Sequence, residues 1–286
     1  MLLYLAPINK FSNHVYRHFM LELGADFVFS EMIMIDKLDS HIEKIKYFKE
    51  DLNKTIFQIG VSSKKEIDLA LKTIPFAREL NINMDCPHSS MKNVCGALLH
   101  NEPLMDELTN YFAKVCKKAK ILSSVKIRLG TSQNEIFINK YLDLFEKNDI
   151  DKVYIHARSL KYSYHKSAIY EPLKSIRKYK FPIIISGDVD NYVSAKKITD
   201  MIDCDIMIGR AAFMNPFIFE QIKNKENLID GPYDPVIKDP NIIRTKFAVL
   251  SERKKLFIEK YEKLSEKEGI EINLRFLKKG LSKSKN

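Results

Sequence analysis

Short apolar segments recur between Leu3 and Gly209, and each is followed by a stretch whose apolar residues repeat with helical spacing. Apolar residues occupy successive positions in runs such as 183–185, which is typical of parallel strands covered on both faces. The pattern therefore predicts parallel strands that alternate with helices. Eight strands are expected, at Leu3–Ala6, Phe27–Ser30, Thr55–Val61, Ile82–Cys86, Ser124–Leu129, Val153–Ala157, Pro182–Gly187 and Asp205–Gly209.

Eight such units in about 225 residues match the α/β class and the closed (β/α)₈ TIM barrel, whose usual length is near 250 residues. The alternative is an open doubly wound sheet, but the chain contains neither G-x-G-x-x-G nor G-x-x-x-x-G-K-[ST]. We expect the barrel to occupy residues 1–230. From residue 235 to residue 286 the pattern predicts a small helical domain, with apolar residues at helical spacing at Leu250, Leu256, Phe257, Tyr261 and Leu264.

The basic charge of the chain is concentrated in this C-terminal segment. The whole chain carries 47 Lys and Arg against 37 Asp and Glu, a net charge of +10, and residues 241–286 hold 13 of these basic residues against 6 acidic ones. A basic excess of this kind favours a polyanionic partner such as a nucleic acid. A solvated pair of helices packed on the barrel explains the same charge without a partner.

Cysteine usage and hydropathy exclude several classes of protein. The four cysteines show no C-x-x-C pair and no histidine at metal-ligand spacing, so we expect neither a metal site nor a disulfide framework. No apolar run approaches the roughly 18 to 20 residues of a membrane-spanning helix, and the first residues lack a signal-peptide pattern. We therefore expect a cytoplasmic protein without membrane association. The sequence does not fix the oligomeric state, for which a monomer is the default.

Polar residues follow most of the predicted strands, and the carboxyl ends of barrel strands are where catalytic groups lie in this fold. Gly187 and Gly209 follow the seventh and eighth strands, where glycine turns commonly bind a phosphate, and Arg210 adds a planar cation. Lys126 and His156 each interrupt an apolar strand near its end. A snorkelling lysine or a satisfied histidine would explain either residue alone. Together in one cavity they suit a flavin, whose reduced ring a lysine stabilises, and Gln58 could bond the ring edge.

Cys86 stands at the end of the fourth predicted strand and is followed by Pro87. A proline at this position turns the chain out of the barrel, so the thiol can be presented to the central cavity. With a reference pKa of about 8.5 it is mostly protonated at neutral pH, and the adjacent Asp85 favours that state. The sequence therefore predicts a proton donor. An inert core thiol is the alternative, and we assign Cys95, Cys116 and Cys204 to packing.

Taken together, the ordered motifs of this chain resemble the tRNA-dihydrouridine synthases, which are FMN-dependent barrels with a small C-terminal helical domain. The similarity covers nearly the whole barrel. It rests on Leu5-Ala6-Pro7, Glu22-Leu23-Gly24-Ala25-Asp26, Ser30-Glu31-Met32, Asn83-x-x-Cys86-Pro87, Gly96-Ala97-Leu98-Leu99, Val125-Lys126-Ile127-Arg128-Leu129-Gly130, His156-Ala157-Arg158-Ser159, Gly187-Asp188, Met207-Ile208-Gly209-Arg210 and Asn215-Pro216.

The resemblance implies a role for each matching residue. Cys86 would be the general acid, and Asn83, Arg128 and Arg158 would bind the target uridine of a tRNA that the basic helical domain helps to hold. In the implied reaction NADPH reduces FMN, a hydride passes from flavin N5 to uracil C6, and the thiol protonates C5 from the opposite side. The residues that would hold FMN are Pro7, Ile8, Asn9, Gln58, Lys126, His156, Ser186, Gly187, Asp188, Gly209 and Arg210.

The sequence also departs from the family pattern. Asp85 stands where the family usually has glycine, and the segment between Pro87 and Gly96 is shorter and poorer in glycine. Ile8 replaces a methionine, Ala157 a glycine and Ser186 an asparagine. Two other functions therefore remain open: an FMN barrel that reduces a free pyrimidine or a small enoate, and a tRNA-binding barrel without catalysis.

Overall fold

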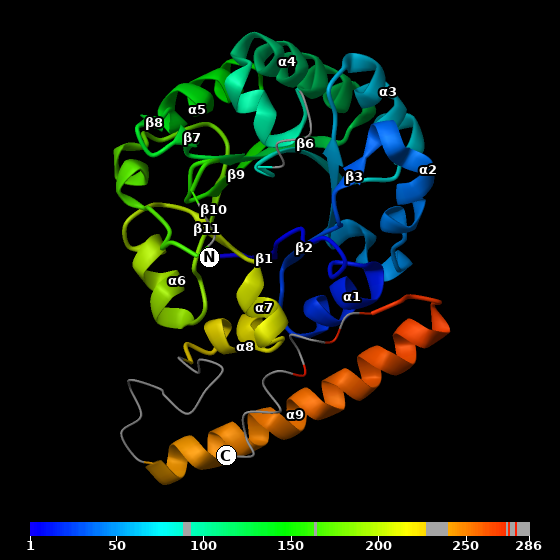
Figure 1. Cartoon of the computed structure of the whole chain (residues 1–286), viewed down its shortest axis with the longest axis vertical. Coiled ribbons are helices and arrows are strands. Elements are labelled where there is room, and N and C mark those ends of the chain that lie inside the picture. Colours follow the sequence, from blue (N-terminus) through cyan, green and yellow to red (C-terminus); the bar gives the residue numbers. More distant parts are fainter. Residues whose placement is uncertain (88–92, 163–164, 227–239, 273, 275–277, 279–286) are drawn as a thin grey trace.

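The structure is a computed structural model that describes residues 1–87, 93–162, 165–226, 240–272, 274 and 278, with no side chains described at 240–251. Figure 1 looks down a ring of strands surrounded by helices. All eight strands of the ring were predicted, and their bounds agree to within three residues. They are β1 (Leu3–Leu5), β2 (Phe27–Phe29), β4 (Thr55–Gly60), β5 (Glu79–Met84), β6 (Leu122–Arg128), β9 (Lys152–His156), β10 (Ile183–Ser186) and β11 (Asp205–Ile208).

Every pair of neighbouring strands in the ring is parallel, and the ring closes. Strand β1 pairs with both β2 and β11, and β2 pairs with β4, so no edge is left open between the first and last strands. The remaining neighbours pair in chain order. This closure confirms the (β/α)₈ prediction, and it brings the carboxyl ends of all eight strands to one end of the barrel.

Strand β5 begins three residues earlier than the apolar pattern indicates. Leu80, Ile82 and Met84 belong to the large core between the strands and the helices. The alternate residues, Asn81 and Asn83 among them, bond to side chains of neighbouring strands inside the barrel. Because side chains alternate between the two faces of a strand, these polar residues interrupt the apolar run without interrupting the strand.

Helices cover the outside of the ring, and several begin at a residue that caps the free backbone N–H groups. Asn13, Ser63, Asn101 and Asn191 accept from the first turns of α1, α3, α4 and α6. The outer helices are α1 (His14–Glu22), α2 (Leu38–His41), α3 (Lys64–Thr73), α4 (Glu102–Ala119), α5 (Ile138–Lys147), α6 (Tyr192–Thr199), α7 (Arg210–Met214) and α8 (Ile218–Lys223).

The helix expected between β9 and β10 is wrong for the residues described there, which form only the 3₁₀ turn Glu171–Ser175. The segment before that turn bonds to residues beyond β9 and β10. The N–H of Ile169 donates to the carbonyl of Ala157 at 2.7 Å, and the N–H of Ala168 donates to the Asp188 carboxylate at 2.7 Å. These bonds hold the segment across the carboxyl ends of the strands.

Two small features are absent from the sequence prediction. Strand β3 (Ile33–Met34) adds a short pairing to β4, and β7 (Gly130–Ser132) forms a hairpin with β8 (Glu135–Ile136). A Cβ at Gly130 would overlap the carbonyl oxygen of Glu135, so the hairpin requires glycine there. The hairpin follows β6 and borders the end of the barrel that carries the polar residues.

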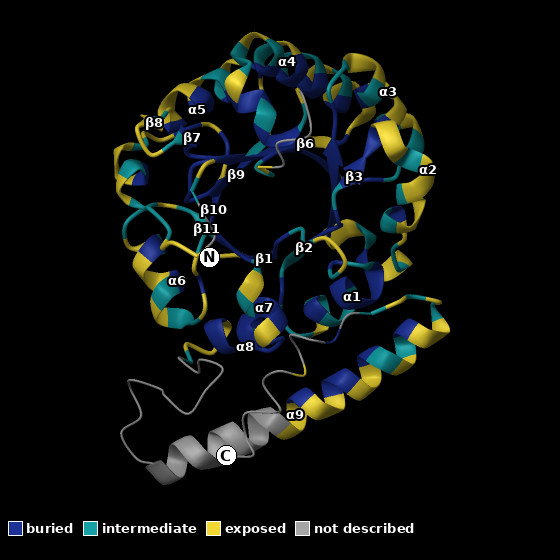
Figure 2. Ribbon diagram, in the orientation of Figure 1, coloured by how far each residue is buried: buried dark blue, intermediate teal, exposed yellow. Residues whose placement is uncertain are grey.

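Helix α9 (Pro240–Lys267) packs against α1 through aromatic side chains. Phe257 and Tyr261 are buried and contact Tyr16 and Phe19 of α1. Leu256 lies in the helix, as predicted, and is 52% exposed. Figure 2 shows buried and exposed residues alternating along the described part of this helix. The expectation for the side chain of Leu250 lies outside the described residues, and the 235–286 domain boundary stays a prediction.

No helix in the described part of the chain combines the length and the apolar composition needed to cross a lipid bilayer.

Candidate active site

A ladder of amide side chains crosses the barrel interior near the carboxyl ends of β4 and β5. Asn83 donates from Nδ2 to Oε1 of Gln58 at 2.8 Å, and Gln58 donates from Nε2 to Oδ1 of Asn81 at 2.8 Å. Asn81 donates in turn to Oγ of Ser124 on β6 at 2.9 Å. All four side chains are buried, so the ladder fixes their orientation in a region without solvent.

The ladder also sets the path of the chain that carries Cys86. Oδ1 of Asn83 accepts the backbone N–H groups of both Asp85 and Cys86 at 3.0 Å. The N–H of Gly96 donates to the carbonyl of Cys86 at 3.0 Å, and a Cβ at Gly96 would lie only 2.6 Å from that oxygen. Cys86 is therefore held from both sides, partly exposed, directly beyond the end of β5.

The other cysteines have different surroundings. Burial raises the pKa of the Cys95 thiol well above its ordinary value, and it raises the pKa of Cys116 and of Cys204 to about 12. None of the four cysteines, all of which are described, forms a disulfide. The assignment of these three thiols to packing stays a prediction.

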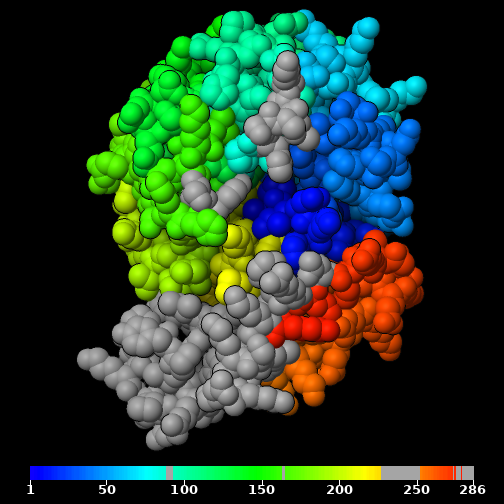
Figure 3. Space-filling model, in the orientation of Figure 1, coloured from blue at the N-terminus to red at the C-terminus, as the bar shows by residue number. Residues whose placement is uncertain are grey.

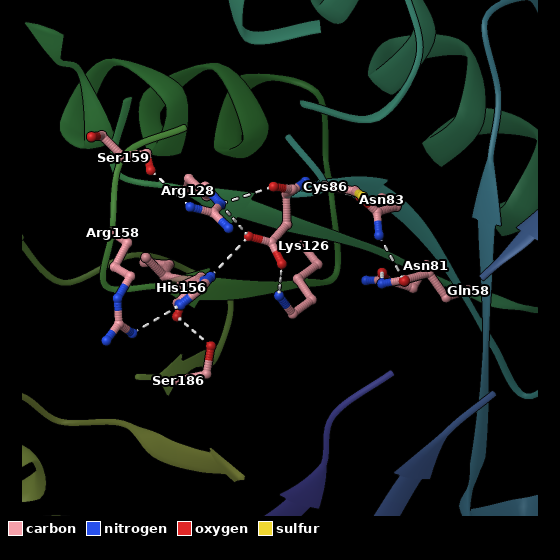
Figure 4. A network of polar contacts seen from close by, with 12 residues as sticks. Gln58, Asn81, Asn83, Cys86, Lys126, Arg128, His156, Arg158, Ser159 and Ser186 are labelled. Carbon is pink, nitrogen blue, oxygen red and sulfur yellow. Dashed lines mark hydrogen bonds and ion pairs between the residues drawn. The ribbon is translucent and has the colours of Figure 1, made fainter. Parts of the chain in front are cut away.

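Asp85 lies where three cationic or polar side chains of β6 and β9 meet. Its Oδ2 accepts from the Lys126 ammonium, and its Oδ1 accepts from Nε of Arg128 at 2.8 Å and from Nδ1 of His156 at 3.0 Å. Figure 4 shows Lys126, Arg128 and His156 turned toward one another. Burial by itself would raise the pKa of Asp85, but Lys126, His156 and Arg128 hold it well below its usual range.

His156 links this cluster to a second ion pair. A carboxylate can only accept, so Nδ1 of His156 donates to Asp85, and Nε2 accepts from Nη1 of Arg158 at 3.2 Å. The ring is therefore neutral, in agreement with the lowering of its pKa, first by burial and then by Lys126 and Arg128 against the opposing effect of Asp85.

Arg158 also forms an ion pair with Asp188, which lies beyond β10. Nη2 of Arg158 lies 2.7 Å from both carboxylate oxygens of Asp188, and Nη2 of Arg210 lies 2.9 Å from one of them. Burial opposes ionisation of Asp188, but the bonds from Arg158 and Ala168 and the charges of Arg158 and Arg210 lower its pKa. We call the whole set the carboxyl-end network: Asp85, Lys126, Arg128, His156, Arg158, Asp188 and Arg210.

The carboxyl-end network has more positive than negative charge. It contains four Lys or Arg side chains and two carboxylates, with His156 neutral, so its net charge is +2. The end of the barrel that faces the viewer in Figure 3 is hollowed near its centre. No group of three or more His, Cys, Asp or Glu side chains in the described ranges is arranged to hold a metal ion.

Comparison with known proteins identifies the family. A family model described as dihydrouridine synthase matches residues 4–275. The chain belongs to the dihydrouridine synthase family. A probable tRNA-dihydrouridine synthase of Aquifex aeolicus is 31% identical over 238 residues, which is 79% of this chain and 74% of that protein. The tRNA-dihydrouridine synthase B of Pasteurella multocida is 26% identical over 286 residues, 97% of this chain and 81% of that protein.

A solved structure supports the fold independently. The 3-hexulose-6-phosphate synthase of Salmonella typhimurium superposes with a TM-score of 0.52 at 12% identity, over 78% of this chain and 95% of that one. At this identity the likeness concerns only the barrel.

The dihydrouridine synthase fold brings most of the predicted site residues to one end of the barrel. Pro7, Ile8 and Asn9 follow β1, with Asn9 exposed. Ser186 ends β10, and its hydroxyl donates to the carbonyl of Ile155 at 3.3 Å. Gly209 lies between β11 and α7. The roles assigned to these residues stay predictions.

Several predicted ligands have partners within the protein. Asn83 and Gln58 bond to each other, and Arg158 is 1% exposed, with Nε and Nη2 also donating to the carbonyl of Lys166. Arg128 donates from Nη1 to the carbonyl of Ser159 at 2.8 Å. These hydrogen bonds fix the loops and strand ends at this end of the barrel, and the same side chains carry donors there.

Asp85 is the functional candidate that the sequence interpretation missed. The sequence interpretation treated it as a neighbour of Cys86 and as a departure from the family pattern, whereas the structure places it among Lys126, Arg128 and His156. A signal was present. Strand pairing sets Asn83 opposite Lys126 and Arg128 opposite His156, so the residues just beyond β5 lie beside this cluster of basic residues. A buried cluster of this kind requires a nearby carboxylate.

Proposed function

We propose that this chain is an FMN-dependent tRNA-dihydrouridine synthase that uses NADPH to reduce the C5=C6 bond of uridine in tRNA. The observation that carries the proposal is the coincidence of two features in a member of the dihydrouridine synthase family. A positively charged network and one partly exposed thiol both lie at the carboxyl ends of the strands. The tRNA substrate is supported by the names of the relatives.

The donor set suits FMN. Its phosphate carries nearly two negative charges at neutral pH, which the net charge of +2 of the carboxyl-end network balances. Gly187 has a φ of +137°, and a Cβ there would lie 2.9 Å from Cβ of Ala168, so this turn favours glycine. Arg210 and the turns at Gly187 and Gly209 would hold the phosphate, and Lys126 would face the ring. When bound, FMN supplies the hydride.

Cys86 supplies the proton in this proposal. Asn83 and Gly96 fix the backbone on both sides of the thiol, and proton transfer to carbon depends on alignment more than on acidity. A positioned acid contributes about 10² to 10⁴ in rate. Asn83 therefore acts on the thiol through the chain, in addition to the contact with uridine that the resemblance implies.

The basic C-terminal segment is proposed to bind the tRNA backbone. The described side chains from residue 252 to residue 278 carry seven basic and six acidic groups, and Arg253, for example, is paired to Glu220 at 2.7 Å. The surplus lies in basic residues whose side chains are outside the described part: Arg244, Lys246, Arg275, Lys279, Lys283 and Lys285. Contacts from these residues to phosphates would offset the cost of a few kcal/mol for flipping a uridine out of its stack.

The test is a Cys86→Ala substitution assayed on unmodified tRNA with FMN and NADPH, with dihydrouridine measured by mass spectrometry. We expect product formation to fall by about 10² to 10⁴ while FMN still binds, because only the positioned acid is lost. Cys204 is a partly buried thiol just before β11, at the amino ends of the strands, so Cys204→Ala is the matched control and should retain activity.

Two outcomes would replace the proposal. Turnover of free uracil or an enoate without turnover of tRNA would assign a small-molecule reductase. A wild-type protein that binds tRNA but neither binds FMN nor forms dihydrouridine would assign a binding protein.

A further inference from the structure

We propose that Asp85 tunes the flavin site by occupying the ammonium of Lys126, so that FMN binds less tightly, above all in its reduced form, and is a stronger hydride donor. This inference rests on the proposed function, since it concerns the cofactor assigned there. Asp85 acts through Lys126, and we therefore describe it as a positioning residue.

Asp85 and its two cationic partners are enclosed by the protein. The side chains of Asp85, Lys126 and Arg128 are 13%, 6% and 0% exposed, so their charges interact with little screening by water. The carboxylate stays ionised because its three partners lower its pKa despite burial. A fixed negative charge thus lies against the ammonium that would face the flavin ring.

The Asp85 carboxylate sets the net charge of the carboxyl-end network. With Asp85 the carboxyl-end network has a net charge of +2, and with a neutral residue at position 85 the same network would have +3. The FMN phosphate alone balances the first value. Reduction of the ring adds negative charge near N1 and C2=O, and charge placed there changes the chemistry of a flavin. Asp85 removes the positive charge that would balance this addition.

Tuning of the flavin by the Asp85 charge differs from a purely structural role of Asp85 in its effect on FMN binding. Arg128 also donates from Nε to the backbone carbonyl of Asp85 at 2.9 Å and from Nη1 to Ser159, so its position does not depend on the carboxylate alone. If Asp85 served only to aim Lys126 at the flavin, its loss would weaken FMN binding. The tuning role predicts the opposite sign.

The experiment compares the full-length wild type with Asp85→Asn, which keeps the shape and removes the charge. Dissociation constants for oxidised and reduced FMN are measured by equilibrium dialysis, and the reduction potential of bound FMN by dye equilibration. In the variant we expect the dissociation constant of reduced FMN to fall by about tenfold or more, and that of oxidised FMN to fall less. The reduction potential of bound FMN should become more positive. Asp143→Asn, which removes an exposed carboxylate on α5, should change none of these values.

A second comparison tests the route through Lys126. In a Lys126→Met background, Asp85→Asn should change the ratio of the two dissociation constants much less than it does in the wild type, because the ammonium that Asp85 occupies is gone. An equal change in both backgrounds would overturn the role assigned to Lys126. Circular dichroism verifies folding, and Asp85→Ser provides the neutral variant should Asp85→Asn fail to fold.

The outcomes distinguish this inference from the proposed function. Equal constants and potentials in wild type and Asp85→Asn, or weaker binding in the variant, would overturn the tuning role and leave the proposed function intact. Tighter FMN binding in the variant, together with a wild type that forms no dihydrouridine, would support the tuning role and remove the proposed function. Failure of every folded variant to bind FMN would remove both.

Discussion

The two ends of the barrel interior both contain buried charges, but they balance them differently. At the amino end, Glu79 accepts from Lys152 at 2.7 Å and from the hydroxyl of Tyr154 at 2.8 Å. The Lys152 ammonium also lies within 6 Å of the ring centroids of Tyr4, Phe27 and Tyr154. One carboxylate is matched by one ammonium, and aromatic rings enclose the pair.

The seven members of the carboxyl-end network comprise four cations, two carboxylates and the neutral His156. Its members lie in or just beyond five different strands, and part of it is open, with the side chain of Arg210 57% exposed. At the amino end the pair is balanced and nearly enclosed, and the cavity that Glu79 and Lys152 line measures only about 30 Å³. An excess of like charge persists in a fold only where an anion or solvent can compensate for it, so the difference in balance marks which end binds.

Glu79→Ala should have the largest effect on stability. It leaves the Lys152 ammonium, whose side chain is 12% exposed, without a carboxylate, and breaking a buried pair in this way costs about 3 to 5 kcal/mol. Urea denaturation should show the loss in the free energy of unfolding. The double variant Glu79→Leu/Lys152→Met removes both charges and should recover most of it, and a double variant as unstable as the single one would contradict the argument from charge balance.

Lys126→Met should cost less stability, no more than about 2 kcal/mol, because Asp85 keeps Arg128 and His156 as partners. The same substitution should markedly weaken FMN binding, since it removes the cation proposed to face the ring. Urea denaturation and equilibrium dialysis separate the two effects. A stability loss as large as that of Glu79→Ala would show that the two ends are balanced alike.

The apolar pattern was sufficient to predict all eight barrel strands, since parallel strands buried on both faces leave a nearly continuous signal. The pattern was insufficient where polar residues face the barrel interior, as at Asn81, and where pairing is only two or three residues long, as in β3 and β7. Such pairings depend on contacts across the fold and leave little trace in the local sequence.

The residues of the site were easier to predict than their contacts. Lys126 and His156 were recognised because each interrupts an apolar strand, and closure of the barrel brings their strands together. Asp85 lies beyond the strand and interrupts no apolar run, so the neighbouring basic residues are the signal for it, and its contact with Lys126 depends on the path of the chain after Met84. Composition and spacing do not fix that path.

The smallest expected effect concerns pH. Burial lowers the pKa of His156, and the facing charges of Lys126 and Arg128 act in the same direction while Asp85 opposes them. Arg158 also faces the ring and donates to Nε2. The unfolded chain therefore takes up a proton at a higher pH than the folded protein, and stability is lost as pH falls from about 6.5 toward the lowered value.

In His156→Asn, which does not titrate, the free energy of unfolding should depend less on pH between pH 7 and pH 5, by at most about 1.4 kcal/mol per pH unit. Urea denaturation at a series of pH values measures the slope in both proteins. His14 and His41, whose pKa values burial also lowers, remain in both and cancel in the difference. A variant with the wild-type slope would show that His156 does not titrate differently on folding, and it would contradict the lowering of the His156 pKa by burial.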